Sequence, residues 1–177
     1  MNNMVKNNKR VTYITHISIS LVFALLYLLQ YSFRIVPKIN GATALLLVPA
    51  VIAAGARLGE WCGFAYGLVF GFLLDSISAN VVFFSSVCLA LIGFLSGFLI
   101  SHLFNRNIIS VIILGLGGCF AFFTFKLFIY IFHGCSGIWD YFIYHSLPSA
   151  LYSFIFTVPL FYLFGKIAGD KHNFKRI

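Results

Sequence analysis

The chain has 177 residues, of which 61% are hydrophobic and 9% are charged, and its mean hydropathy is +0.99. Soluble domains are about a quarter charged, so this composition excludes an ordinary water-soluble globule and indicates a protein embedded in lipid. The net charge of +8 does not indicate nucleic-acid binding, because the basic residues lie at the two ends of the chain and between apolar segments, where phospholipid headgroups face them.

Six apolar segments predict about six transmembrane helices, since a helix needs about 20 apolar residues to cross the hydrocarbon core. They cover about residues 14–33, 42–56, 61–77, 81–103, 108–132 and 147–167. The second and third are the shortest and are separated only by residues 57–60, so a tight cytoplasmic hairpin and a partly re-entrant segment are both open. The predicted fold is all-α, with a single transmembrane domain over 1–177 and short basic cytoplasmic ends at 1–12 and 168–177.

The distribution of Lys and Arg predicts the orientation, because basic residues are retained on the cytoplasmic side during insertion. With both ends inside, nine basic residues lie on the cytoplasmic side and two on the outer side, and an odd number of spans would place one strongly basic end outside. The cytoplasmic set is Lys6, Lys9, Arg10, Arg57, Arg106, Lys166, Lys171, Lys175 and Arg176, and the outer pair is Arg34 and Lys38. We therefore expect a multi-pass protein of the cell (inner or plasma) membrane with both termini in the cytoplasm.

A run of glycines at four-residue spacing crosses the third segment. It comprises Gly55, Gly59, Gly63, Gly67 and Gly71, and Asp75 falls at the next step. In lipid, helices attract each other through close van der Waals packing, which small residues permit. The stripe predicts packing of the third helix against its neighbours in the same chain, with a contact to another protein as the alternative.

Asp75 and Lys126 are charged residues inside or near the ends of apolar segments, where an unpaired charge is costly. The predicted topology places both towards the outer side, so they are candidates for an intramembrane ion pair. The alternative is that Asp75 caps the end of its own helix while Lys126 extends its amine to the headgroups.

No catalytic or metal-binding motif is found. The five histidines, at positions 16, 102, 133, 145 and 172, lack the spacing that aims two rings at one metal, and the four cysteines have no zinc spacing. There is no nucleophile elbow, phosphate-binding loop or pair of carboxylates. The sequence therefore predicts no enzyme, no catalytic residue and no cofactor.

Two prolines mark the last segment. Pro148 fits the first turn of a helix, and Pro159 should kink that helix by removing a backbone hydrogen bond. Tyr152 and Tyr162 flank the expected kink, and their hydroxyls are expected to face protein or an interface.

Two segments resemble the rod shape-determining protein MreD family. They are GFAYGLVFGFLLDSIS (63–78), similar to the family's glycine-rich helix ending in an aspartate, and LPSALYSFIFTVPLFYLFGK (147–166), similar to its last helix. The family's last helix often carries Tyr-Asn where this chain has Tyr152 and Ser153. The resemblance implies a non-enzymatic scaffold of the cell-elongation machinery (the elongasome). It would position peptidoglycan-synthesis enzymes together with an MreC-like protein and an actin-like cytoskeletal protein. The residues it marks for helix packing or partner contact are Gly63, Gly67, Gly71, Asp75, Pro148, Tyr152 and Pro159.

An alternative function is that of a substrate-binding S component of an energy-coupling factor vitamin transporter. Such proteins are similar six-helix proteins rich in glycine, with an acidic residue near the third helix. In that case the residues predicted at the outer side, Arg34, Asp75, Lys126, His133 and Asp140, would line a pocket for a small polar vitamin. Against it, the first segment lacks an alanine-xxx-alanine patch, because it offers only Ser20 and Ala24.

Overall fold

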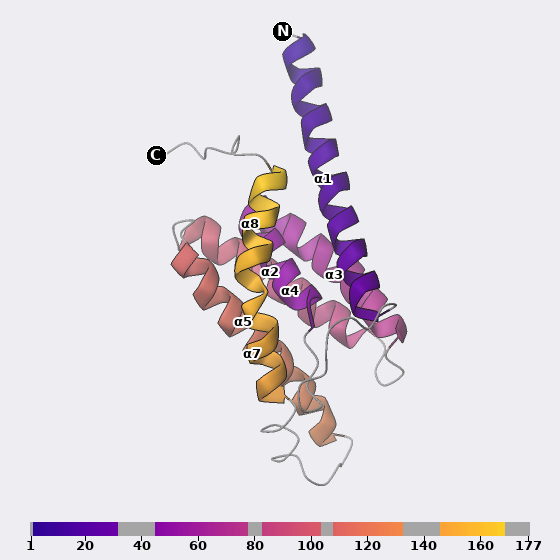
Figure 1. The fold of residues 1–177 in the computed structure, drawn as a ribbon, viewed down its shortest axis with the longest axis vertical. Helices are drawn as coiled ribbons and strands as arrows, with labels where there is room; N and C mark the ends of the chain where they lie inside the picture. Colours follow the sequence, from indigo (N-terminus) through magenta and orange to yellow (C-terminus); the bar gives the residue numbers. More distant parts are fainter. Residues whose placement is uncertain (1, 32–44, 78–82, 104–107, 133–145, 169–177) are drawn as a thin grey trace.

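A computed structural model describes residues 2–31, 45–77, 83–103, 108–132 and 146–168 (Figure 1). These residues are almost wholly helical, with no strand among them, which confirms the predicted all-α class for this part of the chain. The helices are α1 (Asn2–Tyr31), α2 (Leu47–Leu58), α3 (Glu60–Ile77), α4 (Phe84–His102), α5 (Ile108–Phe132), α7 (Leu147–Ile155) and α8 (Thr157–Ala168).

Four segments are long and apolar enough to cross a bilayer: Tyr13–Gln30, Phe84–His102, Ile109–Phe128 and Leu147–Ile167. They support a membrane-embedded protein, as the composition predicts. Helices α2 and α3 are not among the four. With 12 residues, α2 is about 18 Å long against a hydrocarbon core of about 30 Å. The count of six spans therefore stays a prediction.

Helix α2 is the centre of the bundle (Figure 1), because it contacts α1, α3, α4, α5, α7 and α8. Its residues from Leu47 to Ala56 are all buried. A helix that is apolar on every side, as the sequence VPAVIAAGA is, can be buried in lipid or in protein, and the contacts with six other helices place α2 in protein. The shortest predicted segment is thus the core of the molecule.

The last predicted segment is two helices. Helix α7 ends at Ile155 and α8 begins at Thr157, so the helix is interrupted at Phe156. Pro159 has no N–H to donate to the carbonyl of Ile155, four residues earlier, and the Phe156 N–H turns to the Ser153 carbonyl at 3.1 Å. The predicted kink is confirmed as a break one turn before the proline.

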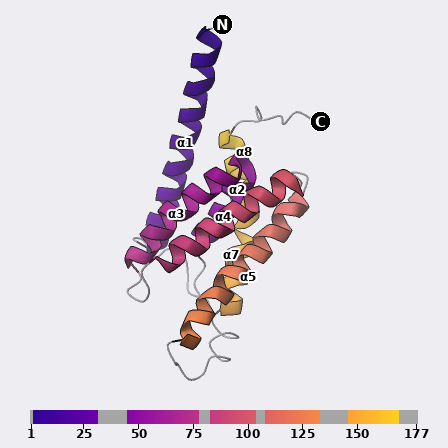
Figure 2. The ribbon, with the colours of Figure 1, turned by 180° about the vertical axis from the view of Figure 1, so that it is seen from behind.

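Helix α1 lies at the periphery. Phe23 enters the core and is fully buried, whereas Ile14, Ile17 and Leu21 are more than 60% exposed. The N-terminal half of α1 extends past the other helices in both views (Figures 1 and 2).

Several predicted features lie outside the described residues. They are the outer candidates Arg34, Lys38, His133 and Asp140, residues 42–44 of the second segment, Arg106, and the basic tail from residue 169.

Candidate functional site

Glycines hold α3 against α4 at backbone contact. Gly63, Gly67 and Gly71 are all buried. A Cβ added at Gly67 would collide with the Leu89 carbonyl, and one at Gly71 would lie 2.5 Å from the Cα of Ser86. Only glycine permits this approach, so the stripe packs within the chain, as its intramolecular interpretation predicts. Figure 2 shows the two helices side by side.

Glycines of α4 and α2 take part in the same contact between helices. A Cβ at Gly97 would lie 2.5 Å from the Cα of Glu60, and one at Gly93 would collide with the Gly63 carbonyl. Gly55 of α2 meets the same region, since its Cβ would be 2.5 Å from the Gly93 oxygen. Helices α2, α3 and α4 therefore form one tightly packed unit.

Asp75 is buried, with 8% of its surface exposed, and its carboxylate caps the N-terminus of α4. One oxygen accepts a hydrogen bond from the Ser85 N–H at 3.0 Å, and the other accepts from the Ser86 N–H at 3.0 Å and the Ser86 hydroxyl at 3.2 Å. The first N–H groups of a helix have no partner within the helix, and negative charge is favoured at that end. Asp75 thus serves the next helix rather than the end of its own, which corrects the capping alternative.

Lys126 lies on α5 and is partly buried. Within the described residues no ion pair joins it to Asp75, whose carboxylate is bound by Ser85 and Ser86. The hydrogen-bond partners of Asp75 are thus residues of α4, and the predicted ion pair is not seen among the described residues.

The backbone N–H groups of the two residues that lead into α2 are also bound by side chains from other helices. The Leu45 N–H donates to the Ser153 hydroxyl of α7 at 2.9 Å, and the Leu46 N–H donates to the Gln30 side-chain oxygen of α1 at 2.9 Å. Ser153 is fully buried and also donates to the Ser149 carbonyl at 2.7 Å. These contacts satisfy backbone donors at the start of a helix that is enclosed by the bundle.

The turn between α2 and α3 packs on α8. Gly59 has φ of +101°, a conformation suited to glycine, and joins the two helices with one residue. The Arg57 guanidinium lies 3.9 Å from the centre of the Phe161 ring, and a Cβ at Gly165 would be 2.6 Å from one of its nitrogens. Gly165 precedes Lys166, so this turn lies beside the basic end of α8.

Tyr66 attaches α1 to α3. Its hydroxyl donates to the His16 carbonyl at 3.2 Å and lies 3.2 Å from the His16 ring nitrogen Nδ1. Its ring stacks on Phe23 at 5.2 Å between centroids, and Phe23 stacks on Phe70 at 4.7 Å. Helix α1 is thus held by aromatic stacking around one buried phenylalanine.

The remaining predicted residues lie on the last two helices. Pro148 occupies the first turn of α7, as expected, and Pro159 is exposed in the first turn of α8. Tyr152 is half-buried, with its ring 5.8 Å from that of Phe156, and Tyr162 is 53% exposed. Ser153, the residue after Tyr152, is the one that contacts the start of the central helix α2.

Sequence reasoning missed the roles of Gln30, Ser153 and Tyr66, and neither of the two alternatives it gave for Asp75 included Ser85 and Ser86 of α4. Each of these contacts joins residues of different helices, 10 to 108 positions apart. Capping motifs that are visible in sequence are local, so no spacing rule predicts a cap from another helix.

The fold and these contacts define an all-α, membrane-embedded protein in which buried polar side chains join helices. Among the described residues, no group of three His, Cys, Asp or Glu is placed to hold a metal ion. Comparison of the chain with protein-family models, curated proteins and solved structures finds no match.

Proposed function

We propose that this protein is an integral membrane scaffold that positions other membrane proteins, most specifically those of an MreD-like cell-elongation machinery. The observation that carries the proposal is that the two segments resembling that family pack on the same central helix. Gly63 of the first segment meets Gly55 of α2, and Ser153 of the second caps the start of α2 at Leu45.

This arrangement supports a scaffold because it gives a rigid interior with large apolar outer faces. The backbones of α2, α3 and α4 are in direct contact with one another. Helices packed this closely have little freedom to move relative to each other. Around it, α1 presents Ile14, Ile17 and Leu21 outwards, and α5 presents Ile109 and Phe125, all more than half exposed. These faces are available to lipid or to the helices of partner proteins.

The proposed partners are an MreC-like membrane protein, wall-synthesis enzymes and an actin-like cytoskeletal protein, in the cell membrane with both termini in the cytoplasm. The test is depletion of the chain in its source cells, combined with affinity purification from membranes cross-linked before extraction. We expect the cells to lose their rod shape and an MreC-like protein to be recovered with the chain.

The control is a variant that should lose its fold, Gly67→Leu, because its side chain would collide with the Leu89 carbonyl. It should neither restore shape nor recover the partner. Purified protein that retains a stoichiometric vitamin, in cells that keep their shape on depletion, would instead identify an S component and refute the scaffold.

A further inference from the structure

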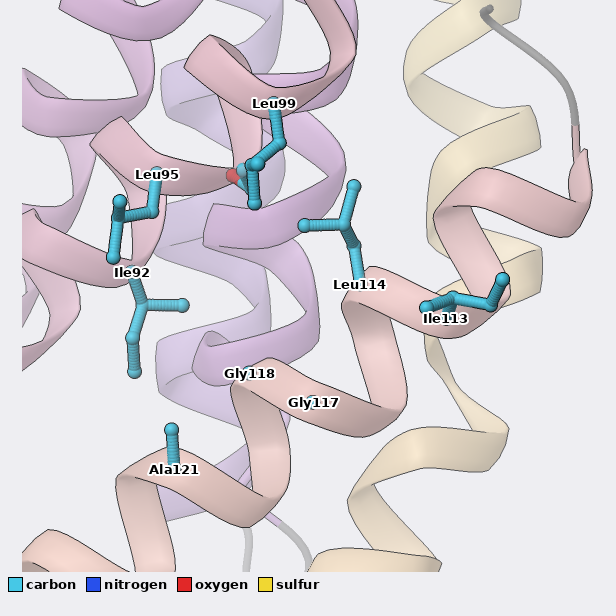
Figure 3. A pocket seen from close by; sticks show the side chains of 9 residues that line it. Ile92, Leu95, Leu99, Ile113, Leu114, Gly117, Gly118 and Ala121 are labelled. Carbon is cyan, nitrogen blue, oxygen red and sulfur yellow. The ribbon is translucent and has the colours of Figure 1, made fainter. Parts of the chain in front are cut away.

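Two glycines of α5 have different surroundings. Gly117 lines an apolar groove of about 300 Å³ between α4 and α5, where an added Cβ would meet nothing within 4 Å (Figure 3). Gly115 lies against Thr157 of α8, because a Cβ at Gly115 would be 2.6 Å from the Thr157 Cγ2 atom and 3.0 Å from its hydroxyl oxygen. The backbone of α5 therefore covers the Thr157 side chain directly.

Thr157 is a buried polar residue whose hydrogen bonding is incomplete. None of its surface is exposed, and its hydroxyl oxygen has no hydrogen-bond partner among the described residues. Ser153, one turn earlier, is equally buried, but its hydroxyl donates to the Ser149 carbonyl and accepts from the Leu45 N–H. Buried polar groups are almost always bound by protein or by ordered water, so the Thr157 hydroxyl requires an explanation.

The interruption of the helix at Phe156 leaves a backbone donor beside this hydroxyl. In a continuous helix the Thr157 N–H would bind the Ser153 carbonyl, but here that carbonyl accepts from the Phe156 N–H at 3.1 Å. Thr157 is the first residue of α8, so its N–H has no partner within that helix. The Ser153 carbonyl keeps a second lone pair. A donor, an acceptor and a hydroxyl thus lie together within residues 153–157.

The interruption lies in the middle of a candidate membrane span. Thr157 is the central residue of Leu147–Ile167, about 15 Å from either end at 1.5 Å per residue. Ordered waters are one means by which backbone groups freed in a broken membrane helix are satisfied. Residues 147–165 and 108–125 carry no charge, so an ion would find no counter-charge on either helix. A small neutral ligand that both donates and accepts fits these groups, and water is such a ligand.

We propose that one ordered water molecule is bound at the interruption between α7 and α8. It accepts a hydrogen bond from the Thr157 N–H, donates to the Ser153 carbonyl and bonds to the Thr157 hydroxyl, which gives it the three partners that are typical of a buried water. The backbone of α5 at Gly115 covers the site. This site is separate from the proposed scaffold function.

Solid-state NMR of the full chain in bilayers tests the proposal. In uniformly 15N-labelled protein, magnetisation is selected on water protons and transferred to nearby amide protons. We expect transfer to the amide of residue 157, which bulk water does not reach in the hydrocarbon core. We expect none to the amide of Thr124, an exposed residue within the continuous helix α5.

Variants of Thr157 identify its hydroxyl as a partner of the water. Thr157→Val removes the hydroxyl and keeps the shape of the side chain, so the variant should fold. The amide of residue 157 should lose its transfer, and the midpoint of thermal unfolding should fall. Thr157→Ser keeps the hydroxyl and should keep the transfer. The matched control is Thr124→Val, whose native hydroxyl bonds to the Phe120 carbonyl of its own helix, and it should leave the amide of residue 157 unchanged.

Absence of transfer to the amide of residue 157 in the native chain would overturn the proposal. A higher unfolding midpoint in Thr157→Val would also overturn it, because removal of a buried hydroxyl that has no partner stabilises a dry site. Transfer that persists unchanged in Thr157→Val would refute the Thr157 hydroxyl as a partner of the water.

Discussion

Asp75 and Ser153 each bind backbone N–H groups at the N-terminal end of another helix, although they are 78 positions apart in the chain. Asp75 binds the first N–H groups of α4, and Ser153 accepts from the Leu45 N–H at the start of α2. A buried donor left without a partner costs about 1–3 kcal/mol, so single polar atoms hold these helices in place.

Replacing Asp75 by alanine should lower the free energy of unfolding by about 2 kcal/mol, because three hydrogen bonds to a buried carboxylate are lost. Unfolding in a denaturing detergent, followed by circular dichroism, measures the change. The control is Ser76→Ala at the adjacent position, where the hydroxyl is exposed and bonds only to its own helix at Phe72. Equal effects of the two substitutions would show that the cap at α4 is unimportant.

Replacing Ser153 by alanine should destabilise the protein by about 1–3 kcal/mol, since the Leu45 N–H loses its acceptor at a site with no exposure. Thr124→Ala is the matched control, because Thr124 also bonds to a carbonyl of its own helix but is exposed. Thermal unfolding in mild detergent distinguishes them, and a Ser153→Ala variant as stable as Thr124→Ala would contradict the capping role.

At the scale of the helix, glycines serve two different purposes that sequence spacing does not separate. Along α3 they let a second backbone approach, whereas Gly117 of α5 faces open space. Replacing glycine by alanine should therefore lower the stability of the protein at the first kind of position and leave it unchanged or raise it at the second.

Gly67→Ala should destabilise the protein by about 1–3 kcal/mol, because its Cβ collides with the backbone of Leu89, which has no side-chain freedom to yield. Gly117→Ala should be neutral or stabilising by up to about 1 kcal/mol, from helix propensity alone. Both variants are compared by the same detergent titration. Loss of stability in Gly117→Ala would show that α5 makes a contact there that the fold does not reveal.

At the scale of the whole molecule, the depth of the α2–α3 turn decides between a spanning hairpin and a re-entrant one. Arg57 packs on Phe161 and Gly165 near the end of α8, and Gly97 of α4 packs on Glu60. The turn thus lies beside the C-terminal halves of α4 and of the last segment, which are predicted to lead to the cytoplasm.

We expect a cysteine at Trp61, in a variant whose four native cysteines are alanine, to react with a membrane-impermeant maleimide only after the cells are permeabilised. Trp61 is 72% exposed at the start of α3, so the position is accessible. Ala79→Cys, between the third and fourth predicted segments, should react in intact cells. A Trp61→Cys variant that never reacts would indicate a re-entrant hairpin and four spans.

The sequence by itself determined that the chain is helical and embedded in a membrane, because hydrocarbon tolerates only backbone that satisfies its own hydrogen bonds. It also placed the bounds of α5 at about Ile108–Phe132 and predicted a kink caused by Pro159, since length, hydropathy and proline chemistry act locally. These properties need no knowledge of which helices are neighbours.

Only the tertiary structure decided which helix is central and which side chains join the others. Apolarity alone does not distinguish a helix that faces lipid from one that faces protein, so α2, the shortest segment, gave no sign that it is enclosed. The partner of Asp75 and the open space at Gly117 likewise depend on which helices lie beside them. Contacts between distant parts of the chain follow from packing, and packing has no periodicity along the sequence.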